Sequence, residues 1–290
     1  MKIQDNVILP IRDSVQPARN NATTAYHCLW GRLPALLFPL FSHCINQMAT
    51  LDYFSAVARK RPWQAVPVTK GEFVPGSEET IFRALAIRHL ELPVKDMLLE
   101  GLKHDLPNSP GLMESIESNW QDEERHDLAL GYVAAAHGLD EKAEAEAMKI
   151  RQAWIDHPAF PIAKVAILER SIFFTILPFF RFNGDKGLRT VASDVSRDEI
   201  CHAFCNTKIC EEMGEKYGES LNKLRKMTAL WIYDDLSSSS NKYLDKDFWL
   251  RCSDSLFLSG KAPGLNDTTA SVMPSFFECN SLNLPAYGAA

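Results

Sequence analysis

The most constraining feature of this sequence is an almost wholly apolar stretch from Ile162 to Phe182, in which Glu169 is the only acidic residue. Such a stretch predicts a helix that is buried on most sides. A lone carboxylate is costly to bury there without a cation beside it. The adjacent Arg170 would point to another side of the helix. The fold must therefore bring a cation to Glu169 from elsewhere.

Two Glu-x-x-His motifs could bind a metal ion that supplies this charge. They are Glu123 with His126 and Glu199 with His202. Residues three apart on a helix are separated by about 60° around its axis, so both side chains of a motif can reach one ion. One such motif is common by chance, whereas two in one chain are more informative.

Each motif is preceded by another acidic residue on a separate predicted helix. Glu91 lies 32 residues before Glu123, and Glu169 lies 30 residues before Glu199. The order Glu, Glu-x-x-His, Glu, Glu-x-x-His, with one element per helix, resembles that of ferritin-like dinuclear carboxylate proteins. We therefore predict an all-α, ferritin-like helical bundle with a four-helix core that holds a dinuclear metal site, extra helices and a flexible C-terminal tail. The predicted ligands are Glu91, Glu123, His126, Glu169, Glu199 and His202.

The donor types indicate which metals would bind. Four carboxylates and two imidazoles suit iron or manganese, as Fe/Fe, Mn/Fe or Mn/Mn, and the anions offset four positive charges. Zinc would take fewer ligands. Glu79 and Glu100 share the predicted helix of Glu91, and Glu124 competes with Glu123 but has the wrong spacing to His126. The alternative is that Glu123, Glu124 and Glu199 lie on solvated helix faces and that Glu169 is a strained or paired core acid.

The chain divides into three predicted regions. Residues 1–23 form an irregular N-terminal arm, residues 24–260 form the helical domain, and residues 261–290 form a flexible tail that carries aromatic and aliphatic side chains. Within the domain, the segment from Arg61 to Gly76 contains three prolines and two glycines, which predicts a crossing loop. Trp63 lies in this loop.

Composition excludes several classes of protein. The formal net charge of −6 gives no electrostatic footprint for nucleic acid or anionic lipid. The seven cysteines are odd in number, form no Cys-x-x-Cys pair and follow no secretory leader, which favours the reducing cytoplasm. Leu33 to Phe41 is apolar but too short to span a bilayer, so we expect no membrane segment.

The sequence Ser196-Arg197-Asp198-Glu199-x-x-His202 resembles the small (beta) subunit of class I ribonucleotide reductase, in which an aspartate precedes the last glutamate ligand. The resemblance implies that Trp63 hydrogen-bonds Asp198 and forms a radical-transfer route with His126. It also implies that Phe173 and Val195 border the metal centre.

The same resemblance implies a function and partners. The protein would be a homodimer that generates a radical for a large (alpha) subunit, which converts ribonucleotides to deoxyribonucleotides for DNA replication. The C-terminal tail would dock on that subunit, and Tyr287 in the tail would relay the radical.

One departure from the family concerns where the oxidising equivalent is stored. The radical tyrosine of the family usually lies four residues after the first metal-bound histidine, where this chain has Leu130. The metals themselves are then the expected oxidant.

Two other classes stay open. A stand-alone dinuclear iron oxygenase, of the arylamine N-oxygenase or desaturase type, is the main alternative, because Asp122-Glu123-Glu124-Arg125-His126 is at least as similar to those families. Val195 stands where N-oxygenases have a further histidine ligand, which counts against them. Iron storage is a third class, but it would not need a link between Trp63 and Asp198.

Overall fold

The computed structural model describes residues 52–260, and every regular element between them is a helix. The predicted arm (1–23), the predicted start of the helical domain at residue 24 and the predicted tail (261–290) lie outside the described residues. None of the helices between residues 52 and 260 has the length and apolar character needed to cross a membrane.

Within residues 52–260, two short 3₁₀ turns and one π turn accompany the α-helices. In order they are α2 (Tyr53–Val57), α3 (Glu78–Ala86), η1 (Ile87–Leu90, 3₁₀), α4 (Glu91–Gly101), α5 (Leu112–His137), α6 (Glu141–Asp156), α7 (Pro161–Leu168), η2 (Glu169–Phe173, π), α8 (Phe174–Asn183), α9 (Lys186–Glu212), α10 (Glu219–Tyr233), η3 (Lys242–Leu244, 3₁₀) and α11 (Lys246–Ser259).

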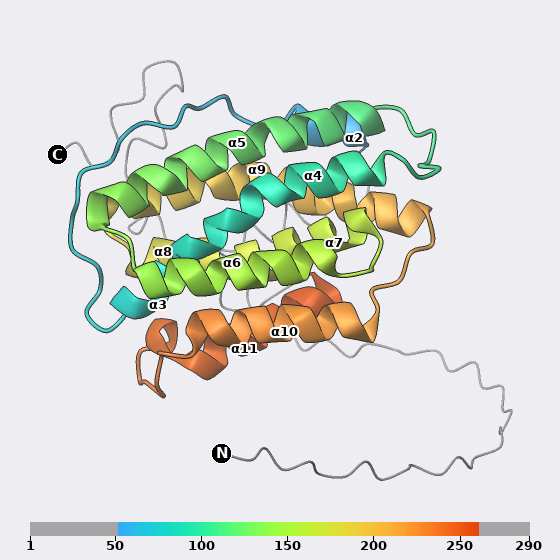
Figure 1. The fold of residues 1–290 in the computed structure, drawn as a ribbon. Helices are drawn as coiled ribbons and strands as arrows, with labels where there is room; N and C mark the ends of the chain where they lie inside the picture. Colours follow the sequence, from blue (N-terminus) through green and yellow to red (C-terminus); the bar gives the residue numbers. More distant parts are fainter. Residues whose placement is uncertain (1–51, 261–290) are drawn as a thin grey trace, which may run out of the picture. The chain divides into compact units, whose positions relative to one another are not determined.

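Four helical stretches form the central bundle. Helix α5 packs against α4 on one side and α9 on the other, and α7 also contacts both α4 and α9. In Figure 1, α4 lies alongside α5, with α9 behind them. Helices α3, α6, α10 and α11 pack around this bundle, and the short helix α2 contacts α5 and α9. The interior between α4, α5, α7 and α9 is therefore closed off from solvent.

The helix predicted to carry Glu79, Glu91 and Glu100 is divided in two by η1, and α4 begins at Glu91. Pro93 explains the division. A proline ring inside a continuous helix would clash with the carbonyl four residues earlier, that of His89, and would remove one backbone hydrogen bond. Proline is tolerated in the first turn of a helix, and Pro93 occupies the first turn of α4.

The predicted apolar helix is also interrupted. Helix α7 ends at Leu168, the π turn η2 runs from Glu169 to Phe173, and α8 follows directly from Phe174. A π turn adds a residue to one turn of a helix and is found often at functional sites. This one begins at the single acidic residue of the stretch.

The predicted crossing loop forms, and it is tied to the bundle at both of its ends. The backbone N–H of Gly71 donates to Asp185 Oδ2 (2.7 Å), and His137 Nε2 lies 2.8 Å from the same oxygen. Phe73 stacks on His137 with ring centroids 4.1 Å apart. A Cβ at Gly71 would come within 2.9 Å of the Asp185 side chain, so only glycine fits this contact. Near the other end, Trp63 is buried against the bundle.

Candidate metal centre

All six predicted ligand side chains point into one buried space of the bundle. Glu91 comes from the first turn of α4, two from α5, Glu169 from the π turn, and two from α9. Each is at most 1% exposed. The three-residue spacing of each Glu-x-x-His motif places both of its members on one face of a helix, the inner face of α5 or of α9.

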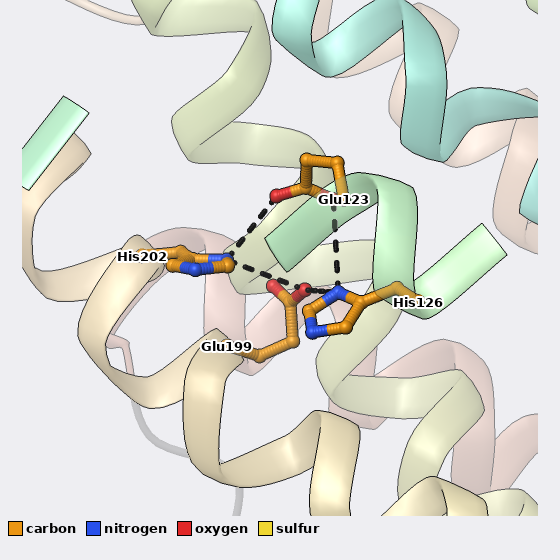
Figure 2. A group of neighbouring side chains, drawn as sticks. All are labelled: Glu123, His126, Glu199 and His202. Atoms are coloured by element: carbon orange, nitrogen blue, oxygen red, sulfur yellow. Dashed lines mark ion pairs between the residues drawn. The ribbon is translucent and has the colours of Figure 1, made fainter. Parts of the chain in front are cut away.

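The donor atoms lie at or slightly beyond the distances expected of ligands that share an ion. Figure 2 shows Glu123 and Glu199 between the two histidines. From His126 Nδ1, the nearest carboxylate oxygens of Glu123 and Glu199 are 3.7 and 3.2 Å away. From His202 Nδ1 the corresponding distances are 3.3 and 3.5 Å. Two ligand atoms each bound about 2.1 Å from one ion lie about 3.0 to 3.4 Å apart.

The remaining two carboxylates distinguish the two histidines. Glu91 Oε2 lies 3.7 Å from His126 Nδ1, and Glu169 Oε1 lies 3.9 Å from His202 Nδ1. The donors therefore form two groups, Glu91 with His126 and Glu169 with His202. Glu123 and Glu199 stand between the groups and contact both histidines.

Unpartnered polar atoms show that this donor set fits a metal ion. Both carboxylate oxygens of Glu123 and of Glu199 are buried with no hydrogen-bond partner, as are Glu91 Oε2 and the Nδ1 atoms of His126 and His202. Buried polar atoms are rarely left unpaired, because each such atom loses its hydration without compensation. Here the unpaired atoms converge on one another. A metal ion could bind to this buried cluster of Glu123, His126, Glu199 and His202 and would satisfy them together.

Without a metal, burial and mutual repulsion disfavour the ionised carboxylates. Burial raises the pKa of Glu123 and of Glu169 well above the ordinary value, and nearby carboxylates add to the effect. Burial likewise raises the pKa of Glu199 to about 7. Positive charge at this site would reverse these shifts, since it favours the ionised form.

The two histidines have different electrostatic surroundings. Burial acts to lower the pKa of His126, but contacts with Asp198, Glu123 and Glu199 raise it well above the ordinary value. Burial lowers the pKa of His202 well below the ordinary value, and the nearby Lys60 acts in the same direction. His202 is therefore held as the neutral imidazole, which is the form that binds metals.

Glu169 is held by amide groups. Asn119 Nδ2 donates to its Oε1 (3.0 Å) and Asn206 Nδ2 donates to its Oε2 (2.9 Å). Arg170, as expected from its position on the helix, points away and donates to the backbone carbonyls of Leu256 and Phe257. Sequence reasoning missed the two asparagines, although each lies four residues from a ligand on the same helix face, Asn119 before Glu123 and Asn206 after His202.

Behind His126, a hydrogen-bonded path leads away from the cluster. Trp63 Nε1 donates to Asp198 Oδ2 (2.7 Å), and the same oxygen lies 3.3 Å from His126 Nε2. The Trp63 and His126 rings are roughly parallel, with centroids 6.0 Å apart. Hydrogen bonds from His126 and Trp63 hold the pKa of Asp198 below the ordinary value, although burial acts to raise it.

A second aspartate occupies the matching place behind His202. Asp122 Oδ2 lies 2.9 Å from His202 Nε2 and forms an ion pair with Lys60, while Arg125 pairs with its other oxygen. Arg125 also reaches Asp198 Oδ2 at 3.2 Å. Sequence reasoning did not assign roles to these residues. The repeated pattern Asp-Glu-x-x-His, at residues 122–126 and 198–202, was the signal that could have found Asp122.

The other predicted site residues are only partly described. Leu130, Phe173 and Val195 are buried in the hydrophobic core. Tyr287 lies outside the described residues. The roles inferred for these four from family resemblance stay predictions.

Comparisons with known proteins do not identify a family. No family model, curated protein or solved structure matches the chain. What the centre does must therefore be inferred from its residues.

Proposed function

We propose that the buried cluster binds two metal ions, iron or manganese, and that the fold is ferritin-like. The two donor groups support two ions, with Glu91 and His126 at one, Glu169 and His202 at the other, and Glu123 and Glu199 shared. Four ionised glutamates would balance two divalent ions, and oxygen with imidazole donors suits these metals.

We further propose that the protein is the radical-generating small subunit of a class I ribonucleotide reductase. The observation that carries this proposal is the path from Trp63 through Asp198 to His126. A metal-storage or purely structural site has no need of a buried indole hydrogen-bonded to a carboxylate that contacts a ligand. Trp63 reaches Asp198 across 135 residues of sequence.

When bound, the metal pair would supply the oxidising equivalent, drawn from dioxygen or superoxide. The indole of Trp63 would carry that oxidising equivalent away from the centre, and the Asp198 carboxylate would stabilise the positive charge on the indole. Tyr287 would give an electron to the oxidised indole of Trp63 and lose its phenolic proton to solvent. It would then regain an electron and a proton from a cysteine thiol in the active site of the large subunit, leaving the thiyl radical that starts nucleotide reduction.

The experiment that tests this function combines metal analysis with turnover. The full-length protein is loaded with Fe²⁺, Mn²⁺ or both, and nucleotide reduction is measured with a class I large subunit from the same organism. We expect two equivalents of metal and activity in at least one loading. Tyr287→Phe should abolish turnover and leave metal content unchanged. Undiminished turnover in Tyr287→Phe would remove the relay, and fewer than two metal equivalents in every loading would overturn the dinuclear site.

Two further measurements, oxygen consumption and peptide binding, separate the main alternative. A stand-alone oxygenase would bind two metals and consume dioxygen without any large subunit, and a peptide of its C-terminal residues would not bind one. Binding of that peptide to the large subunit would support the reductase.

A further inference from the structure

Two side chains from one short segment outside the bundle reach both aspartates of the centre. Lys60 Nζ pairs with Asp122, donates to the hydroxyl and the carbonyl of Ser118 at 2.7 and 3.2 Å, and lies 3.4 Å from His202 Nε2. Three residues later, Trp63 donates to Asp198. The side chain of Lys60 is 10% exposed, so its ammonium group lies largely out of water beside the candidate metal centre.

The two aspartates are arranged crosswise. Asp122 lies on α5 but contacts His202 on α9, whereas Asp198 lies on α9 but contacts His126 on α5. Each contact is made at Nε2, so the Nδ1 of each histidine is left to face the glutamates. A carboxylate that accepts the second N–H of a ligand histidine fixes its tautomer and ring orientation.

We infer that Lys60 is a positioning residue for the half of the centre that contains His202. It would hold Asp122 where that carboxylate accepts the His202 Nε2–H, which keeps the Nδ1 lone pair directed at the metal position. The inference rests on the proposed binding of two metals. Lys60 thus pairs with the aspartate behind His202, as Trp63 donates to the aspartate behind His126.

The need for Lys60 follows from the competing partner of Asp122. Arg125 pairs with one oxygen of Asp122, while Lys60 and His202 share the other. Without Lys60, the Asp122 carboxylate is free to turn both oxygens toward Arg125, since a guanidinium favours a bidentate pair. His202 would then lose its acceptor and its fixed orientation.

The direction of the effect distinguishes positioning from simple electrostatics. Removing a positive charge near a cation site would by itself strengthen binding of a divalent ion. Losing the partner that orients a ligand histidine weakens metal binding, typically 10- to 100-fold. We expect positioning to dominate, so Lys60→Met should weaken binding of one of the two ions.

The test is a titration of the metal-free, full-length protein with Mn²⁺ alone, with free Mn²⁺ followed by electron paramagnetic resonance. Wild type should bind two equivalents. In Lys60→Met one of the two equivalents should be weakened by roughly 10- to 100-fold and the other should be little changed. Lys60→Arg should bind both equivalents like wild type. Lys95→Met is the matched control, because Lys95 pairs with Glu124 at the exposed surface, and it should bind like wild type.

A double-variant comparison tests the route through Asp122. Asp122→Asn should weaken the same equivalent, and adding Lys60→Met should weaken it little further, because residues that act through one contact are not additive. If Lys60→Met does not fold, as judged by circular dichroism, Lys60→Gln replaces it with the same expectation. If Lys60→Met binds two equivalents as tightly as wild type, or more tightly, the role of Lys60 is overturned. Fewer than two equivalents in wild type would instead overturn the dinuclear site.

Discussion

The Glu199 carboxyl should make the metal-free protein less stable as the pH rises. Its side chain is fully buried, and burial raises its pKa to about 7 in the folded protein, against an ordinary value of 4.5. Between these values the folded state holds a proton that the unfolded state has lost. The contribution of Glu199 to the free energy of unfolding is therefore fully present below its pKa in the unfolded protein. It is lost as the pH rises through its pKa in the folded protein.

The size of the effect follows from the same two values. The difference between 4.5 and about 7 corresponds to roughly 3 kcal/mol of unfolding free energy. Glutamine is nearly isosteric and cannot ionise. Glu199→Gln should therefore leave the metal-free protein near wild-type stability at about pH 5 and make it more stable than wild type by roughly 3 kcal/mol at about pH 8.

The assay is urea unfolding of both proteins in the presence of a chelator, followed by circular dichroism at both pH values. Comparing the two proteins removes the contributions of titrating groups that do not interact with Glu199. His126 is not one of these groups, because contact with Glu199 helps to raise its pKa. Glu124→Gln is the control, because the Glu124 side chain is 60% exposed and should change stability little at either pH.

Added Mn²⁺ should make wild type the more stable of the two proteins. Wild type should gain stability with bound metal, because ligands that bind only the folded state stabilise it, while Glu199→Gln should gain much less. The reasoning would be refuted if metal-free Glu199→Gln were no more stable than wild type at about pH 8.

Three further predictions address the path, the oxidant and the core. Trp63→Phe keeps an aromatic ring but removes the N–H that binds Asp198, so metal analysis should find two equivalents while turnover with the large subunit is lost; retained turnover would contradict the path. In the proposed reductase, Leu130 stands where the family has its radical tyrosine, so the oxidised, metal-loaded protein should show no tyrosyl radical by electron paramagnetic resonance; a tyrosyl signal would contradict a metal-based oxidant. Phe179 is fully buried and makes edge-to-face contacts with both Tyr233 and Trp249, so Phe179→Ala should lower the unfolding free energy by about 3–5 kcal/mol in urea titrations, and an effect near zero would contradict the packing.

The helices and the six donor residues could be predicted from sequence because they depend on local periodicity. Three-residue spacing places each glutamate and histidine on one helix face, and a single acid in an apolar stretch marks a buried charge. The breaks within the helices were missed. Pro93 was visible in the sequence and explains why α4 starts at Glu91, whereas nothing local marked the π turn that begins at Glu169.

The sequence by itself therefore determined which side chains could bind a metal, since helical spacing alone decides which residues share a face. Only the tertiary structure decided how those side chains are held. Asp122 supports a histidine on another helix, and Lys60 reaches it from a segment 62 residues earlier in the chain. Such contacts depend on how α5 and α9 pack and on where the crossing loop lies, and no spacing within one helix encodes them.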